Sequence, residues 1–377
     1  MNTRRALLKS LAALPVVSAC ATATVAARRN YTPSGLPLRR ADISDDRVVR
    51  IVTGLRPFRP TGFVVRAERF DDKTVIHNYG HGGGGVTLSW GTAHLAADLA
   101  RPSPQRRCAV LGCGAVGLAT ARLLQRYGRE VTIYARDLPP ETTSNIAGAQ
   151  WSPASFYDRD AVDERFYERL AVAMRHAYRE FQHLYGPRYG IRWVSNYYVS
   201  DRPMAKDDLR HHYAAMFPEL ADLAPDEHPF PARYATHFDT MFIEPPVYLP
   251  AVMRDFRDAG GTIVVREFRD VPDILALDEA LIVNCTGLGS KALFGDDDLI
   301  PVKGQLVVLK PQDDLHYLMI SDGIYMFPRT DGVLLGGTFE RNEWSLVPDA
   351  AETRRILQSH RTFFRNMDDP WALPWTT

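Results

Sequence analysis

The sequence predicts an α/β protein of two parts. One part alternates strands and helices, and the other is an α+β part built on an antiparallel sheet. Three observations predict this fold. Residues 107–137 have the pattern of a strand, a glycine-rich turn, a helix and a second strand. Residues 74–91 repeat the order of strand, glycines and helix. Residues 305–336 contain three short apolar segments that suggest antiparallel strands. With 377 residues, the chain is long enough for two domains.

The first twenty residues are interpreted as an export signal rather than as part of the fold. Residues 3–9, TRRALLK, form a twin-arginine pattern, and a short apolar stretch follows at residues 10–19. Residues 17–20, VSAC, resemble the lipobox of bacterial lipoproteins with Cys20 as the lipidated residue; cleavage after Ala21 or Ala23 is the alternative. We therefore expect export by the twin-arginine route to the periplasm or cell surface, with membrane contact only through a lipid on Cys20.

Composition excludes some classes of function. Lys and Arg number 45, as do Asp and Glu, so the formal net charge is zero and a broad surface for nucleic acid is not expected. The four cysteines form no CxxC pair and the eleven histidines show no metal-ligand spacing, so neither a disulfide framework nor a metal site is predicted. Residues 21–45 are polar without a clear period and are expected to be a linker.

The first predicted strands cover residues 47–52, 63–70 and 74–79. Residues 54–60, GLRPFRP, are predicted to form a rigid turn because two prolines leave the backbone few conformations. Four consecutive glycines follow the third strand, and a helix is expected from about Val86 to Leu99. Backbone N–H groups between such a strand and helix can face a charged ligand.

The next unit, residues 107–137, carries the pattern GxGxxG between a predicted strand and a predicted helix. Gly112 permits the tight turn, Gly114 allows the backbone to approach a pyrophosphate, and Gly117 allows the helix to pack closely on the strand. Asp137 follows Gly117 by twenty residues, where an acid binds a ribose in a Rossmann-type unit. Arg136 beside it suits a phosphorylated ribose instead, so this stretch leaves FAD, NAD and NADP open.

Further helices and strands are expected after residue 137. A polar stretch at 139–151 precedes a long amphipathic helix, and residues 205–231 have the charged, proline-containing composition of a lid or excursion. The remaining expected elements are the helices 163–185, 248–259 and 350–364, the strands 191–199, 238–244, 262–265, 281–284, 305–309, 323–327 and 333–336, and a tail from 368.

Several stretches together resemble the D-amino-acid oxidase family of FAD enzymes. The most specific are TGLRPFRP (53–60) and VIHNYGHGGGGVTLSWG (75–91). The others are GCGAVGLATA (112–121), TTSNIAGAQW (142–151), IVNCTG (282–287), KGQ (303–305) and LLGGTFE (334–340). In that family the two specific segments come last, whereas here they come first, so the chain resembles a circularly permuted member. The new join would be residues 101–105, which reach at most about 20 Å at roughly 3.5 Å per residue.

The resemblance implies a division into domains and a set of residues around FAD. The FAD-binding domain would comprise residues 67–157 and 246–300, and the substrate domain residues 46–66, 158–245 and 301–366. The residues implied to hold FAD are Gly82, Gly84, Gly85, Val86, Thr87, Gly112, Gly114, Ala115, Val116, Gly117, Arg136, Asp137, Thr142, Thr143, Ser144, Ala147, Gly148, Thr286 and Gly287.

The resemblance also implies how an amino-acid substrate is bound. Arg56 would grip its carboxylate, and the carbonyl of Gly83 would accept from its amine. Tyr234 is the expected substrate tyrosine; the alternative at this place is that Arg233 recruits an acidic side chain. Tyr325 and Arg329 are weaker candidates for the pocket, because a tyrosine in such a sheet more commonly serves packing.

The implied reaction is oxidative deamination of a D-amino acid. A hydride passes from Cα to flavin N5, the imino acid hydrolyses to a 2-oxo acid and ammonia, and molecular oxygen reoxidises the flavin to give hydrogen peroxide. The alternatives are a related amine oxidase or dehydrogenase for glycine, sarcosine or acidic D-amino acids, an NADP-dependent dehydrogenase, and a non-catalytic lipoprotein.

Overall fold

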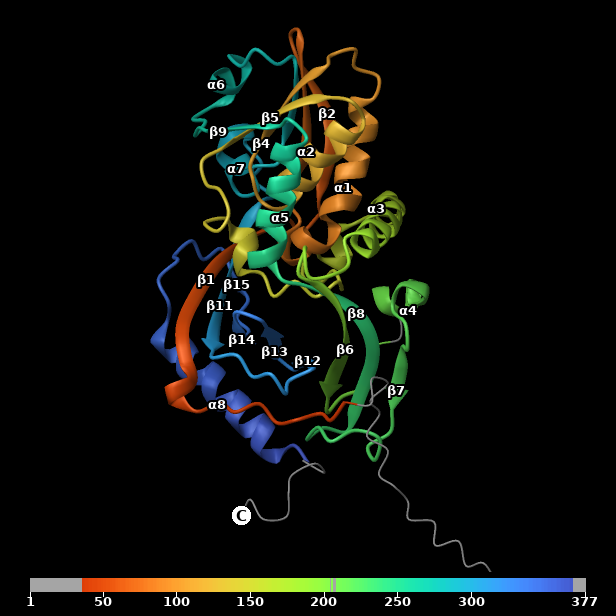
Figure 1. Ribbon diagram of the computed structural model, residues 1–377, viewed down its shortest axis with the longest axis vertical. Coiled ribbons are helices and arrows are strands. Elements are labelled where there is room, and N and C mark those ends of the chain that lie inside the picture. Colours follow the sequence, from red (N-terminus) through yellow and green to blue (C-terminus); the bar gives the residue numbers. More distant parts are fainter. Residues whose placement is uncertain (1–35, 204, 206–207, 369–377) are drawn as a thin grey trace, which may run out of the picture.

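The computed structural model describes residues 36–203, 205 and 208–368. The predicted export signal, with Cys20, most of the predicted linker, and tail residues 369–377 lie outside the described residues. Two sheets dominate the molecule, and Figure 1 shows them one above the other. No helix among the described residues has the length and apolar character needed to cross a bilayer.

The upper sheet has six strands in the order β2-β3-β10-β4-β5-β9. All neighbours are parallel except β2 and β3. The strands are β2 (Val64–Phe70), β3 (Lys73–Tyr79), β4 (Arg107–Leu111), β5 (Glu130–Ala135), β9 (Thr262–Val265) and β10 (Leu281–Asn284). Central strands of a parallel sheet are covered on both faces, and β4 and β10 are accordingly almost entirely buried apolar residues.

Helices cover both faces of this sheet. On one face α1 (Gly85–Ala100), α2 (Ala115–Arg126) and α5 (Pro245–Asp258) share the largest hydrophobic core, and on the other lie α6 (Val271–Leu275) and α7 (Gly289–Phe294). The helix α3 (Glu164–His183) packs on α1, where a Cβ added to Gly91 would lie 1.9 Å from the Ala173 carbonyl oxygen. The sequence-based boundaries assigned α3 to the substrate domain, but its buried residues belong to the core of the upper sheet.

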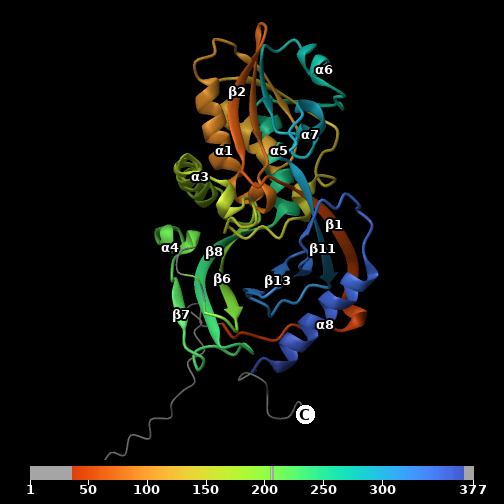
Figure 2. The ribbon, with the colours of Figure 1, turned by 180° about the vertical axis from the view of Figure 1, so that it is seen from behind.

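The lower sheet is strongly curved, as Figures 1 and 2 show from opposite sides. Its order is β1-β11-β14-β13-β12-β6-β8-β7, and β15 pairs with β11. Neighbours are antiparallel apart from β12 and β6. The strands are β1 (Val48–Phe58), β6 (Ile191–Ser200), β7 (Ala221–Leu223), β8 (Tyr234–Ile243), β11 (Ile300–Leu309), β12 (Tyr317–Ser321), β13 (Ile324–Arg329), β14 (Gly332–Gly336) and β15 (Glu340–Arg341).

The two faces of the lower sheet have different coverings. Helix α8 (Ala350–Asn366) packs on one face through Ile356 and Phe364. The other face, which carries Val194, Phe327 and Leu334, packs against Ile146 of the upper part. The remaining helices are short: η1 (Asp45–Arg47), η2 (Gly82–Gly84), η3 (Thr143–Ile146), η4 (Arg159–Ala161), α4 (Leu209–His212) and η5 (Ala214–Met216).

One predicted turn is instead a strand. Residues 54–58 were expected to turn, but β1 continues through Phe58 in register with Ile300 of β11. The prolines do not prevent this, because β1 lies at the edge of the sheet, where an edge strand can do without one N–H group. Consequently Arg56 is presented by a strand, in a position fixed by the sheet.

The join required by a circular permutation is compact. Helix α1 ends at Ala100 and β4 begins at Arg107, so six residues connect them. The Arg129 guanidinium donates to the carbonyl oxygens of Ala100 and Ser103, both at 2.9 Å, and to that of Gln105. One side chain therefore holds this connection along its length, and the circular permutation stays a prediction.

Candidate functional site

The first glycine-rich loop lies between β4 and α2. Gly112 has a φ of +102°, and a Cβ there would lie 2.5 Å from the Cys285 carbonyl oxygen. A Cβ on Gly117 would lie 2.1 Å from the carbonyl oxygen of Gly112. Both positions therefore require glycine, as the sequence predicted. No side chain caps α2 at Gly114, and the Ala115 N–H donates to Ser144 Oγ (3.1 Å), so the helix start is bare backbone that suits a phosphate.

The second glycine-rich loop joins β3 to α1. Gly82–Gly84 form one 3₁₀ turn, η2, and Gly83 donates its N–H to the Ser155 carbonyl (2.9 Å). A Cβ on Gly83 would lie 2.6 Å from the carbonyl oxygen of Ala154. His81 bonds Thr92 Oγ1 at 2.9 Å, and burial lowers the pKa of His81 to about 3. This loop therefore carries a neutral imidazole at pH 7 and presents the N-terminus of a sixteen-residue helix.

The two loops meet at one edge of the upper sheet. Strands β3 and β4 both pair with β10 in parallel, so the carboxyl ends of all three strands lie side by side. Beyond β10, Thr286 donates its hydroxyl to Asn284 Oδ1 (2.8 Å), and Gly287 lies against Pro57. The predicted groups Thr286 and Gly287 thus stand between the two glycine loops.

The segment after β5 lines the space between the two sheets. In this segment Thr142 bonds the Asn145 side chain (2.8 Å), while Asn145 Nδ2 is buried without a partner in the protein. Arg329 donates to the Ala147 carbonyl at 3.3 Å, and a Cβ on Gly148 would lie 2.5 Å from the Phe327 ring. An unpaired buried amide and a close glycine approach fit a polar ligand placed along this segment.

Arg136 and Asp137 form an exposed pair. Arg136 Nη2 lies 2.8 Å from Asp137 Oδ2, and its Nη1 lies 3.3 Å from Glu267 Oε1. The hydrogen bond that Arg136 donates to Asp137 raises the pKa of Arg136 further. Because two carboxylates already engage this guanidinium, the reason for expecting a phosphorylated ribose there is weakened.

Arg56 lies where the two parts of the molecule meet. The next residues of β1 contact the glycine loops: Pro57 touches Gly287, and Phe58 forms a β-bridge with His81. The Arg56 side chain lies on the sheet face that carries Tyr325 and Phe327 and packs against Ile146 of η3. Its Nη1 donates to the Thr338 carbonyl (3.3 Å). Arg56 thus lies two residues along β1 from the bridge to His81, which precedes the second glycine loop.

Tyr325 lies on the same sheet face as Arg56. Burial raises the pKa of the Tyr325 hydroxyl, and the nearby Arg56 charge opposes that rise. Both Gly336 and Gly337 leave room for the phenol ring, because a Cβ on either would lie within 2.7 Å of it. Arg56 and Tyr325 are therefore neighbours on one face, whereas the sequence favoured packing for Tyr325.

Tyr234 and Arg233 lie at the start of β8 and just before it. Tyr234 is the first residue of β8 and pairs with Ser200, while the Arg233 N–H donates to Asp201 (3.2 Å). Residues 234–237 thus belong to a strand rather than to a loop before it. Thr236, two residues from Tyr234, is directly opposite Tyr198. Substrate binding by Tyr234 or Arg233 stays a prediction.

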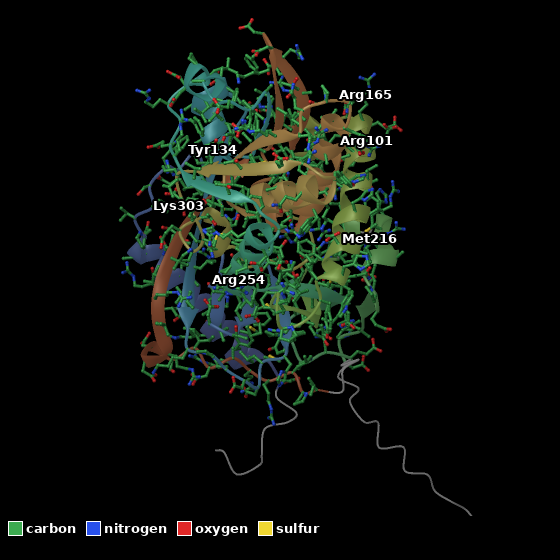
Figure 3. All side chains as sticks on the ribbon, turned by 45° about the horizontal axis from the view of Figure 1, so that its top comes forward. Arg101, Tyr134, Arg165, Met216, Arg254 and Lys303 are labelled. Atoms are coloured by element: carbon green, nitrogen blue, oxygen red, sulfur yellow. The ribbon has the colours of Figure 1, made fainter. Side chains whose placement is uncertain are left out.

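Side chains fill the region between the two sheets in Figure 3. Lys303, labelled there, lies on β11 beside β1, and its ammonium donates to the Val347 carbonyl (2.9 Å). Thr53 of β1 donates to the Leu346 carbonyl, so residues 346–347 are tied to the edge strand near Arg56. Among the described residues there is no cluster of His, Cys, Asp and Glu suited to a metal ion.

Comparison with known proteins shows the protein family to which the chain belongs. The family model for FAD-dependent oxidoreductases of the DAO type matches residues 23–99 and 107–376, and the chain belongs to this family. The gap between the two matched blocks contains the predicted join.

Individual relatives narrow the class. The chain is 30% identical over 259 residues to the D-amino-acid oxidase of Dictyostelium discoideum, and the alignment covers 68% of this chain and 72% of that protein. It is 28% identical to human D-aspartate oxidase, in an alignment that covers 67% of this chain and 74% of that protein. A solved glycine oxidase from Bacillus cereus has the same fold, with a TM-score of 0.53, 15% identity and coverage of 69% of this chain and 78% of that one. The protein is therefore a D-amino-acid oxidase-like enzyme that uses FAD.

Proposed function

We propose that this enzyme oxidises D-amino acids to 2-oxo acids, with release of ammonia and hydrogen peroxide. The observation that supports the proposal is that Arg56 and Tyr325 lie on one sheet face, on a sheet whose strand β1 continues from Arg56 to a bridge with His81 of the second glycine loop. A planar guanidinium beside a phenol hydroxyl is suited to a carboxylate. Similarity to the Dictyostelium D-amino-acid oxidase supports the substrate class.

In this proposal the protein binds and orients, and FAD when bound supplies the hydride acceptor. Arg56 makes two parallel hydrogen bonds to the α-carboxylate and fixes its rotation, and Tyr325 donates a third. The Gly83 carbonyl accepts from the α-amine, which sets which face of Cα is presented. His81 stays neutral, because burial keeps its pKa near 3, so no positive charge next to Gly82 repels the amine.

The residues that would hold FAD lie along one continuous path. The pyrophosphate would lie at the start of α2, on Gly112, Gly114 and Gly117 with Ser144, and the ribose beside Asp137. The isoalloxazine would contact Ala147 and Gly148 on one side and the η2–α1 loop on the other. The N-terminus of α1 would then stabilise negative charge on the reduced ring.

The test is a spectrum of the purified holoenzyme before and after anaerobic addition of D-amino acids. We expect two visible flavin bands that bleach with D-amino acids and persist with the L-isomers. A flavin that no D-amino acid bleaches would overturn the proposal. Oxygen uptake with production of peroxide tests oxygen as the acceptor.

A second candidate is an oxidase for acidic D-amino acids. Human D-aspartate oxidase is among the relatives at 28% identity, and it favours this possibility. Rates with D-aspartate and D-glutamate against D-alanine separate the two candidates. The same panel with glycine and sarcosine tests for a related amine oxidase.

We also propose that the protein is exported by the twin-arginine route and anchored through Cys20. The support is the sequence TRRALLK followed by VSAC, which lies outside the described residues. Cell fractionation of the wild type and of the Arg4→Lys, Arg5→Lys double variant tests the route. Retention of mature wild-type enzyme in the cytoplasm would contradict the proposal.

A further inference from the structure

A group of polar atoms without partners surrounds Tyr198 on β6. Asn196 is fully buried, and neither its Oδ1 nor its Nδ2 has a hydrogen-bond partner among the described residues. Gln150 is 9% exposed and donates from Nε2 to Tyr198 Oη (3.1 Å), but its Oε1 has no partner among these residues. The Arg210 guanidinium lies 3.9 Å above the Tyr198 ring, with Nη1 buried and likewise without a partner. A buried polar group without a partner is costly, and a ligand that bonds to it offsets that cost.

This group lies on the sheet face that carries the proposed substrate site. Tyr198 is directly opposite Ile320, and Ile320 is directly opposite Tyr325, so all three side chains share one face. Two strand spacings separate the Cα atoms of Tyr198 and Tyr325, about 10 Å. Gln150 follows the proposed flavin contact Gly148 by two residues. A substrate held by Arg56 and Tyr325 therefore has its side chain within reach of Gln150 and Tyr198.

The charge of Arg210 is already compensated. Its Nε donates to Asp208 Oδ2 at 2.7 Å, and Nη2 contacts the same carboxylate. Asp208 also accepts from the N–H of Arg210 (3.0 Å) and lies 2.8 Å from the His211 ring, which fixes the carboxylate at the start of α4. Arg210 thus offers one free donor from a neutralised pair rather than an open positive charge.

We propose that Gln150, Tyr198 and Arg210, backed by Asn196, bind a carboxamide at the end of the substrate side chain, so that D-asparagine and D-glutamine are preferred substrates. This inference rests on the proposed function. The carboxamide oxygen accepts from Arg210 Nη1, and its NH₂ group donates to Gln150 Oε1 or to the side-chain oxygen of Asn196. Because the four unpaired atoms are out of contact with water, the side chain enters by displacement of α4, which carries Arg210 over Tyr198.

A carboxamide fits these groups better than a carboxylate does. Whichever way its amide is turned, Asn196 always has one unpaired donor and one unpaired acceptor, so the ligand must supply both. A carboxylate supplies acceptors only. It would also add an uncompensated negative charge beside Asp208, and burying such a charge is costly. An aliphatic side chain would leave all four atoms unpaired.

The experiment measures kcat/KM of the holoenzyme for D-asparagine, D-glutamine, D-aspartate, D-leucine and D-alanine. D-leucine matches D-asparagine in shape without its polar atoms. We expect kcat/KM for D-asparagine to exceed that for D-leucine and for D-aspartate by at least tenfold. Gln150→Leu and, separately, Arg210→Met should lower the D-asparagine to D-alanine ratio about tenfold or more, mainly through KM. Arg202→Met, which removes an arginine that is 82% exposed in the same segment, should leave the ratio unchanged.

Two outcomes would overturn the inference while leaving the proposed function intact. Equal kcat/KM for D-leucine and D-asparagine would show that no polar subsite exists. A D-aspartate rate above that of D-asparagine would show that the subsite takes a carboxylate. Failure of every D-amino acid, D-alanine included, to reduce the bound flavin would instead reject the proposed function. If Arg210→Met disturbs α4, the Gln150→Leu variant still tests whether the subsite binds a carboxamide, because Gln150 lies outside that segment.

Discussion

At the scale of single residues, the proposed site depends on Arg56 and its neighbour Tyr325. Arg56 is recognisable in the sequence, because the motif around it is specific. Tyr325 cannot be recognised from the sequence, because its role follows from the register that places β13 beside β14 and β14 beside β11. Tyr234 was the more obvious tyrosine along the chain, and its strand places it opposite Ser200. Long-range pairing, which local sequence does not reveal, is what brings Tyr325 onto the sheet face of Arg56.

Replacement of Arg56 by lysine should weaken binding of the carboxylate. A lysine cannot make the two parallel hydrogen bonds, and a hydrogen bond to a charged group contributes about 1.5–3 kcal/mol. We expect kcat/KM for D-alanine to fall roughly 10- to 100-fold, mostly through KM, with flavin content unchanged. Arg50→Lys on the same strand is the control, because Arg50 pairs with Asp331 at the far end of β1. Equal losses in both variants would argue against a specific role for Arg56.

Tyr325→Phe removes one donor while keeping the ring that fills the space beside Gly336 and Gly337. We expect a smaller loss, about tenfold in kcat/KM, because one hydrogen bond to the carboxylate disappears. Tyr234→Phe should have a smaller effect, since β8 lies three strands away from β13 in the sheet. Steady-state kinetics on the two variants side by side decides which tyrosine contacts the substrate.

At the scale of elements, the two strand–glycine–helix units could be predicted from the sequence. The course of β1 and the packing of α3 could not. The glycines at 82–85 and 112–117 marked both helix starts within a residue or two, because turn chemistry is local. The strand through Pro57 was missed, because its stability comes from pairing with β11 and from its position at the sheet edge. The packing of α3 on α1 was missed for a similar reason: an amphipathic period shows that a face is buried, but not against what.

Gly83→Ala should disturb the loop at the start of α1. Its Cβ would lie 2.6 Å from the Ala154 carbonyl oxygen, which is backbone and has little freedom to move; such overpacking costs about 1–3 kcal/mol. We expect weaker flavin retention, read as a lower ratio of visible to ultraviolet absorbance after gel filtration. Gly128→Ala, after the end of α2, is the control: an added Cβ there meets no atom within 4 Å, and its φ of +81° strains the backbone away from this loop. Full flavin content in Gly83→Ala would contradict a tight contact there.

At the scale of the whole molecule, buried histidines link stability to pH. Burial lowers the pKa of His81 to about 3 and also lowers the pKa of His360. Between about pH 3 and pH 6.5, the unfolded chain binds a proton at His81 that the folded chain does not bind. The contribution of this histidine to the free energy of unfolding is therefore full above about pH 6.5. It falls as the pH drops toward 3, by about 1.4 kcal/mol per pH unit.

Urea unfolding of the wild type at several pH values between 7 and 4.5 measures this slope. His81→Asn should be less stable at pH 7 but should lose less stability on acidification than the wild type. His316→Gln, which changes an exposed histidine, should keep the wild-type slope. A slope unchanged in His81→Asn would mean that His81 is protonated in the folded state over this range.

The proposed circular permutation can also be tested on the whole chain. Tyr317 Oη donates to the Arg39 carbonyl (2.7 Å) and lies 3.8 Å from Met367 Sδ, so the two ends of the described chain meet at one phenol. A variant that begins at Gln105, ends at Pro102 and links Met367 to Leu38 by a short glycine–serine linker should fold and retain flavin. A variant cut between Leu95 and Ala96, inside α1, is the control and should not. An insoluble first variant would contradict the permutation.

The meeting of the two chain ends has a practical corollary. Residues 36–45 and the end of α8 lie at the bottom of the curved sheet in Figure 1, and the glycine loops lie beyond its other end. A tether, fluorescent label or purification handle fused directly before residue 36 or after residue 368 therefore departs from the pole remote from the nucleotide. If the enzyme is attached to a support through that pole, its cofactor-binding end faces the solution.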